Sequence, residues 1–317
     1  MKLNRFVIDR IAKASIEFKR FQFDRSLPDV RVGGCKYFRF LPIAISIAIS
    51  LNSQPILANS SSSYIFKEIQ KTGRLRVGLR QDAPPIGYRN AQGVLTGYCV
   101  DAIAALKQQL QEKLNLSYEI LVDIYTSTRT SRFELVADGT VHLECGPNNI
   151  DENVEEVAFS DPFLISGTHF LINTQTRGNL DYEGDLEEDI VGVLRETTTE
   201  TVIAQRYPQT NLQYFRGPTG AFRGIEALED RIDAFASDGI LLIGEVVTRG
   251  LPLANYRLVP LVPLSCESYG MILPEGDGVW AGFVNSVLAS PEADLIWQDW
   301  FEVKFPYIRL DEEVCGD

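Results

Sequence analysis

Short strands alternate with helices along most of this chain, and that alternation limits its fold more than any other feature. Residues 74–80 alternate basic and apolar side chains, which indicates a strand, and residues 99–114 carry apolar side chains at helical spacing. Further strands are expected at 117–122 and 141–145, with a helix at 131–137 between them. Such an order predicts βαβ units and a mostly parallel sheet.

The same pattern restarts in the second half of the chain. A helix that opens at the run Thr197-Thr198-Thr199-Glu200 and continues to Tyr207 has the signature of a capped N-terminus. Strands are expected at 168–173, 190–194, 212–215, 232–237 and 269–273, and further helices at 221–229, 279–288 and 294–301. A chain of 317 residues has room for about two domains. The sequence therefore predicts two similar α/β halves.

Charge is unevenly distributed between the start of the chain and the rest. Residues 1–58 hold ten Lys and Arg against four acids, whereas the remainder holds 20 basic and 39 acidic residues. Twelve uncharged, mainly apolar residues at 40–51 follow the basic stretch, and these are the parts of a secretory signal peptide. We expect 1–58 to be a signal peptide cleaved after Ala58, with 59–73 a linker and first helix. An uncleaved anchor or a buried helix is the alternative.

Composition excludes several classes of function. The net charge of −13 opposes contact with phosphate backbones, so no nucleic-acid role is expected. No apolar run reaches the roughly 18–20 residues of a confident membrane span, which excludes a multi-span membrane protein. The only histidines, His142 and His169, lie near no recognisable nucleophile motif, and no Cys-x-x-Cys pair occurs. We therefore expect no metal, no cofactor and no catalytic residue.

The cysteine count agrees with export. Removing the leader removes Cys35 and leaves four cysteines, Cys99, Cys145, Cys266 and Cys315. An even number in an exported chain suggests two disulfides, and four cysteines allow three pairings.

Several short motifs, taken in order, resemble the family 3 extracellular solute-binding proteins, the amino-acid receptors of ABC importers. Each motif is weak alone, but together they extend over residues 74–301. They are Leu75-Arg76-Val77-Gly78, Ala83-Pro84-Pro85, Leu95-Thr96-Gly97-Tyr98, Phe159-Ser160-Asp161-Pro162-Phe163, Val191-Gly192-Val193-Leu194 with the threonine run, Asp233-Ala234-Phe235 with Asp238, Tyr269-Gly270, and Trp297 with Trp300-Phe301.

The resemblance implies two α/β lobes joined by two crossing segments that close on a ligand like a hinge. Residues 74–167 and 266–317 would form lobe 1, and residues 170–262 would form lobe 2. Cys99–Cys145 and Cys266–Cys315 is then the favoured disulfide pairing. The implied partners are a small amino acid-like ligand and the membrane subunits of an ABC importer. We expect a periplasmic or otherwise extracytoplasmic monomer.

The resemblance also implies ligand-binding residues, in a cleft where strands end. Asp238 matches the family's acid for a ligand ammonium group, and its alternative role is a helix N-cap. Thr197 and Thr198 match the helix start that offers N–H groups to a carboxylate, a role compatible with simple capping. Further cleft candidates are Asn148, Asp82 and Tyr88, although Asp82 could be a solvated turn acid and Tyr88, like Tyr98, a core residue.

One position departs from the family pattern. Asn153 stands where the family has its carboxylate-clamping arginine, and a neutral amide cannot replace that charged fork. Arg129 and Arg132 lie on a segment that approaches the cleft in the family, so either could substitute. The alternative for Arg132 is pairing with acids at the lobe surface.

Three functions remain in competition. The first, and the one we favour, is an extracytoplasmic receptor that delivers a small polar solute, such as an amino acid, to an ABC importer. The second is an enzyme on the same scaffold, similar to cyclohexadienyl dehydratases, which would need a general acid beside an anion clamp. The third is a sensory or partner-binding protein with a degenerate cleft.

Overall fold

The computed structural model describes residues 62–305 and Cys315. All of these residues belong to one compact unit, 58–317. The expected signal peptide and its cleavage point after Ala58 lie outside the described residues. Among the residues that are described, no helix is long and apolar enough to cross a membrane.

The first lobe, lobe 1, is built on a five-stranded sheet. Its strand β1 lies between two parallel neighbours, as expected from the βαβ pattern of the sequence. Two antiparallel strands, one of them from the C-terminal part of the chain, complete the sheet. In spatial order the strands are β5 (Leu121–Thr126), β1 (Arg74–Leu79), β6 (Leu143–Cys145), β14 (Ile272–Pro274) and β7 (Val157–Phe159).

Lobe 2 has a second sheet of similar construction. Two parallel pairings join three of its strands, and two antiparallel pairings add the rest. In spatial order the strands are β10 (Asn211–Phe215), β9 (Ile190–Leu194), β11 (Ala234–Asp238), β8 (Leu164–Asn173) and β12 (Tyr256–Val259). The parallel pairs come from βαβ units, while the antiparallel strands enter each sheet where the chain passes from one lobe to the other.

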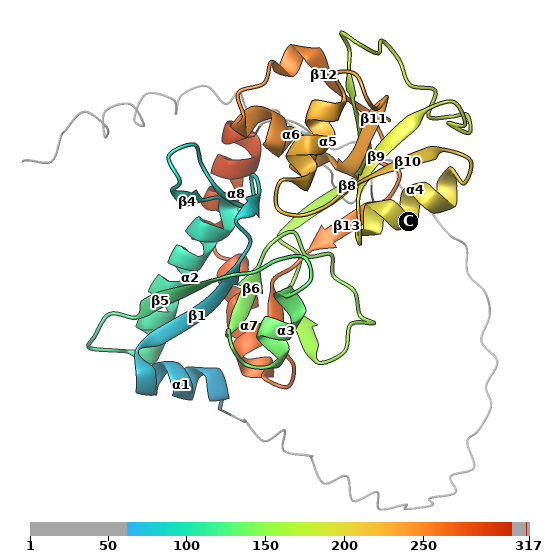
Figure 1. Ribbon diagram of the computed structural model, residues 1–317. Coiled ribbons are helices and arrows are strands. Elements are labelled where there is room, and N and C mark those ends of the chain that lie inside the picture. Colours follow the sequence, from blue (N-terminus) through green and yellow to red (C-terminus); the bar gives the residue numbers. More distant parts are fainter. Residues whose placement is uncertain (1–61, 306–314, 316–317) are drawn as a thin grey trace, which may run out of the picture. The chain divides into compact units, whose positions relative to one another are not determined.

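Two strands make that passage side by side. The ten-residue strand β8 pairs at its start with β13 (Cys266–Tyr269) and along its second half with β11 and β12. Figure 1 shows β8 and β13 running between the two sheets. The fold is thus the two-lobed α/β arrangement with two crossings that the sequence motifs imply.

Helices cover both sheets and complete the cores of the two lobes, and Ile240 of a lobe 2 helix packs into the main core of lobe 1. In lobe 1 Trp280, Tyr98 and Tyr269 are among the largest fully buried side chains, and in lobe 2 Phe170 and Phe235 are. The lobe 1 helices are α1 (Tyr64–Thr72), α2 (Tyr98–Leu114), α3 (Arg132–Ala137), α7 (Gly278–Leu288), α8 (Pro291–Gln298) and the π-helical turn η3 (Asp299–Lys304). The lobe 2 helices are α4 (Thr198–Arg206), α5 (Gly220–Ala227), α6 (Gly239–Thr248) and the 3-10 turn η2 (Leu253–Asn255). A small ribbon of β2 (Asp82–Ala83), β3 (Gly87–Arg89) and β4 (Leu95–Thr96) lies beside α2.

Several elements differ from the expectation, and the strands β7 and β12 have no counterpart in it. The strand expected at 117–122 lies at 121–126, because Leu121 pairs with Arg74 at the start of β1, and this edge strand leaves Leu121 and Tyr125 exposed. The strand expected at 269–273 is two strands, β13 and β14, interrupted after Tyr269. Helix α6 was not expected at all, because its sequence is apolar on nearly every side and lacks helical periodicity.

Both disulfides form in the pairing favoured by the lobe assignment. Cys99, at the start of α2, bonds Cys145, at the end of β6, and both are fully buried. Cys266, the first residue of β13, bonds Cys315.

Candidate ligand-binding cleft

A cavity of about 160 Å³ is lined by residues of both lobes. Lobe 1 contributes the loop after β1 and the segment that leads into α3. Lobe 2 contributes the ends of β9 and β11 with the starts of α4 and α6. The carboxyl ends of parallel strands meet at one edge of a sheet, so the side chains that follow them converge there.

Three arginines enter the cavity from lobe 1, and one of them already has an acidic partner. Arg80 follows β1 and is almost completely buried; its Nε donates a hydrogen bond of 2.8 Å to Asp82 Oδ1. Asp82 is thus the ion-pair partner of an arginine rather than a solvated turn acid. Arg80 lies against Gly146, where a Cβ atom would come within 2.7 Å of Arg80 Cγ.

The other two arginines, Arg129 and Arg132, form no ion pair within the described part of the chain. Arg132 Nη1 donates to the carbonyl of Pro147 and to Asn148 Oδ1, at 3.0 and 3.2 Å. Burial lowers the pKa of both guanidinium groups, although an arginine remains charged at neutral pH. Two cations therefore face the cavity without a protein carboxylate in contact.

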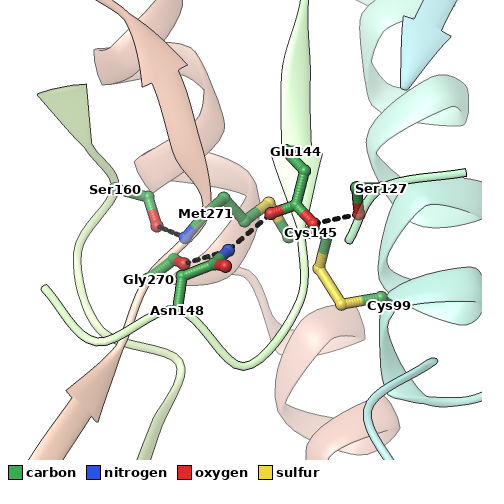
Figure 2. Close-up of a disulfide and its surroundings, with 8 residues drawn as sticks. All are labelled: Cys99, Ser127, Glu144, Cys145, Asn148, Ser160, Gly270 and Met271. Carbon is green, nitrogen blue, oxygen red and sulfur yellow. Dashed lines mark hydrogen bonds between the residues drawn. A yellow bond between two sulfur atoms is a disulfide. The ribbon is translucent and has the colours of Figure 1, made fainter. Parts of the chain in front are cut away.

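A buried polar network holds the partner of Arg132 in place (Figure 2). Asn148 is completely buried; its Nδ2 donates to Glu144 Oε2 at 2.6 Å and to the carbonyl of Gly270. The second Glu144 oxygen accepts from the hydroxyl of Ser127. These bonds link β6 to the β5–α3 segment and to the residues that follow β13, next to the Cys99–Cys145 disulfide.

Asp238 is the anionic counterpart on lobe 2. It ends β11 and is buried, and its carboxylate accepts a hydrogen bond from the hydroxyl of Tyr269. Its side chain does not cap α6, although it occupies the N-cap position of that helix. Burial raises the pKa of Asp238, whereas the Tyr269 and Thr199 hydroxyls and the charge of Arg132 act in the opposite direction. No cation within the described residues forms an ion pair with it.

The start of α4 forms the rest of the lobe 2 wall. Thr197 caps the helix, accepting from the N–H of Glu200 at 3.2 Å. The N–H groups of the first helical turn have no carbonyl partner within the helix, and they carry the positive end of its dipole. Thr197, Thr198 and Thr199 all line the cavity, which makes this helix start a suitable place for an anionic group.

The two lobes touch at the rim of the cavity. Asn149 Nδ2 of lobe 1 donates to Thr198 Oγ1 of lobe 2 at 2.8 Å. Gly244 of α6 lies so close to the carbonyl of Pro84 that a Cβ atom there would approach the oxygen to 2.1 Å. The structure therefore represents a closed cleft.

A match to a family model accompanies this geometry. Residues 75–302 match the model of the bacterial extracellular solute-binding proteins, family 3. The chain belongs to this family. The interpretation of the sequence as an extracytoplasmic solute receptor of the ABC-importer type is confirmed.

Two bacterial binding proteins are similar to this chain over most of its length. The glutamate/aspartate import solute-binding protein of Escherichia coli is 28% identical over 279 residues, which cover 85% of this chain and 89% of the relative. The L-glutamate/L-aspartate-binding protein of Pseudomonas aeruginosa is 29% identical, covering 84% and 90%.

Solved structures share the fold of this family 3 receptor. The ancestral amino acid-binding protein AncCDT-1, a precursor of cyclohexadienyl dehydratase, superposes with a TM-score of 0.62 at 22% identity and covers 74% of this chain and 99% of its own. The GluR0 ligand-binding core with L-glutamate superposes with a TM-score of 0.55 at 22% identity, covering 71% and 93%.

Most residues singled out from the sequence of this receptor do line the cavity. They are Asp82, Arg129, Arg132, Thr197, Thr198 and Asp238.

The other candidates lie outside the cavity. Asn148 lies behind the wall and contacts Arg132 instead, and Tyr88 lies on β3, packed against the lobe 1 core. Tyr98 is fully buried and stacks on Phe163. Asn153 is exposed and binds Asp151, away from the cavity.

Sequence reasoning missed other lining residues, among them Arg80, Asn149 and Glu245. Arg80 is the last residue of the strand predicted at 74–80, so the strand-end rule could have found it. Glu245 lies on the unexpected helix α6 and pairs with Arg249 at 2.8 Å. Asn149 gave no signal, because its role depends on the meeting of two lobes.

Proposed function

We propose that this receptor binds an acidic amino acid, glutamate or aspartate, in the closed cleft. One observation carries the proposal: the cavity presents two unpaired guanidinium groups, Arg129 and Arg132, and one unpaired carboxylate, Asp238. A buried charge needs a partner of opposite sign. Two carboxylates and one ammonium group satisfy that set, and glutamate and aspartate carry these groups.

The remaining charges of the cavity do not alter this balance. Asp82 pairs with Arg80 and Glu245 pairs with Arg249, so both acids are neutralised within the protein. Glu196 is exposed, and with Asp82 it acts on Arg129 only through space. The names of the Escherichia coli and Pseudomonas aeruginosa relatives support the same ligand class.

In this proposal Asp238 binds the ammonium group, and the start of α4 with the two arginines binds the carboxylates. The ligand leaves unchanged, since holding a zwitterion needs no proton transfer to or from it. The receptor then acts as a monomer that presents its closed form to the membrane subunits of an ABC importer.

A thermal-shift panel of free amino acids tests the proposal. Glutamate and aspartate should raise the melting temperature in a concentration-dependent way, since a ligand that binds only the folded state stabilises it. Arginine and the neutral amino acids should have little effect. Mass spectrometry of ligand recovered after incubation should return the intact amino acid. A shift with arginine alone would contradict the assigned charges, and a converted ligand would contradict the non-enzymatic role.

A further inference from the structure

One face of the strands that cross between the lobes carries a row of buried polar groups. Thr168 of β8 pairs with Asp238, and Ser166 pairs with Glu267. Side chains two residues apart on a strand share a face, so Tyr269 joins Glu267 on that side. All five are buried, Glu267 being 7% exposed. This row, the hinge row, begins at the cavity wall and continues into the hinge.

The hinge row contains two carboxylates and lacks a cation of its own. Asp238 accepts from Tyr269, and Glu267 Oε1 accepts from Ser265 at 2.5 Å. Glu267 Oε2 has no hydrogen-bond partner among the described residues. Neither carboxylate forms an ion pair in the described part of the chain.

The charged and titratable groups around the row do not neutralise it. Arg132 of α3 acts on Asp238 through space, and Thr199 of α4 offers only a hydroxyl. His169 of β8 has a lowered pKa because of its burial, so it stays uncharged at neutral pH. Burial and the charge of Asp238 raise the pKa of Glu267 to about 7. Two buried carboxylates that interact in this way do not both ionise readily.

We propose that Asp238 and Glu267 retain one proton in the ligand-free receptor and that the ammonium group of the bound amino acid expels it, so that ligand binding releases a proton to solvent. This inference rests on the proposed function, because it needs a ligand with an ammonium group beside Asp238. The ammonium supplies the positive charge that the hinge row lacks. Both carboxylates can then be ionised in the closed complex.

The sign of the pH dependence follows from linkage. Where binding releases a proton, affinity rises with pH, by up to about tenfold per pH unit for one proton. The rise should occur below about pH 7, where the free receptor still holds the proton, and level off above it. Acidification should therefore weaken binding of an amino acid that itself stays zwitterionic.

The test is calorimetric titration with L-glutamate near pH 6 in two buffers that differ in ionisation enthalpy. The difference in heat divided by the difference in ionisation enthalpy gives the number of protons released. We expect a release that approaches one proton for the unmodified receptor. Glu267→Gln should release almost none and lose most of the pH dependence, because an amide cannot carry that proton. Glu275→Gln, the same change at an exposed site, should behave like the unmodified receptor.

The outcomes separate this inference from the proposed function. Tight glutamate binding with heat that does not depend on the buffer would overturn the proton release and leave the proposed function standing. If the Glu267→Gln variant still releases as much of the proton as the unmodified receptor, Glu267 is not the source of that proton. If neither glutamate nor aspartate binds at any pH, the proposed function is wrong, and this inference is wrong with it. The two-buffer comparison needs only the unmodified protein, so it tests the proton release even if Glu267→Gln fails to fold.

Discussion

The two walls of the cleft carry opposite charges and are built in different ways. Lobe 1 supplies cations, Arg80 and Arg129 from loops and Arg132 from the start of α3, with a buried carboxylate and a disulfide behind them. Lobe 2 supplies an anion and a helix start directly from the ends of β11 and β9. The lobe 1 wall thus depends on tertiary support, whereas the lobe 2 wall depends on strand topology.

Asp238→Asn should weaken glutamate binding more than any other change considered. Asparagine keeps the size of the side chain but removes the charge that faces the ligand ammonium group. Removing one partner of a buried charge pair costs about 2–5 kcal/mol, so calorimetric titration with glutamate should show affinity weakened roughly thirtyfold or more.

The control for this change is Asp189→Asn, a buried acid of the same lobe that pairs with Arg177 outside the cavity. That variant should lose stability and keep its affinity for glutamate. Unchanged affinity in Asp238→Asn would show that lobe 2 supplies no ammonium site.

Arg132→Gln and Arg129→Gln examine the opposite wall. Loss of a charge-assisted hydrogen bond to a carboxylate costs about 1.5–3 kcal/mol, so each change should weaken glutamate binding about ten- to a hundredfold. The exposed control Arg257→Gln should have no effect on the dissociation constant. If only one of the two changes weakens glutamate binding, the proposal that both arginines bind ligand carboxylates is wrong.

Asn149→Ala should have the smallest effect, because it removes one hydrogen bond between the walls. A neutral hydrogen bond contributes about 0.5–1.5 kcal/mol, so glutamate affinity should fall two- to tenfold. The matched control is Asn153→Ala, which removes an exposed amide outside the cavity and should leave affinity unchanged. Equal effects of the two variants in the same titration would show that the contact between Asn149 and Thr198 does not stabilise the closed form.

The same contrast between the walls explains how far the sequence could predict the site. Asp238, Thr197 and Thr198 follow apolar strands, and strand ends converge in a doubly wound sheet, so their position could be inferred. The role of Asn148 could not, because it lies behind the wall and acts on Arg132 through a network that joins four segments. The partners of Glu267 depend on the register of β13 against β8, which no local pattern specifies.

The fold itself was predictable where periodicity was strong. Strand β9 matched its expected bounds, and helix α2 differed by one residue at its start. Helix α6 was missed because an almost uniformly apolar helix looks like a buried strand over a short window. The edge strand β5 was displaced because its exposed residues follow no burial pattern.

The most direct test of the account compares glutamate with glutamine on the unmodified receptor. The two ligands have nearly the same shape and differ in one carboxylate, so the ratio of their dissociation constants measures the second cationic site. Calorimetric titration of both ligands should give glutamate about ten- to a hundredfold tighter, the value of one charge-assisted interaction. Equal affinity, or tighter binding of glutamine, would contradict the pairing of two arginines with two ligand carboxylates.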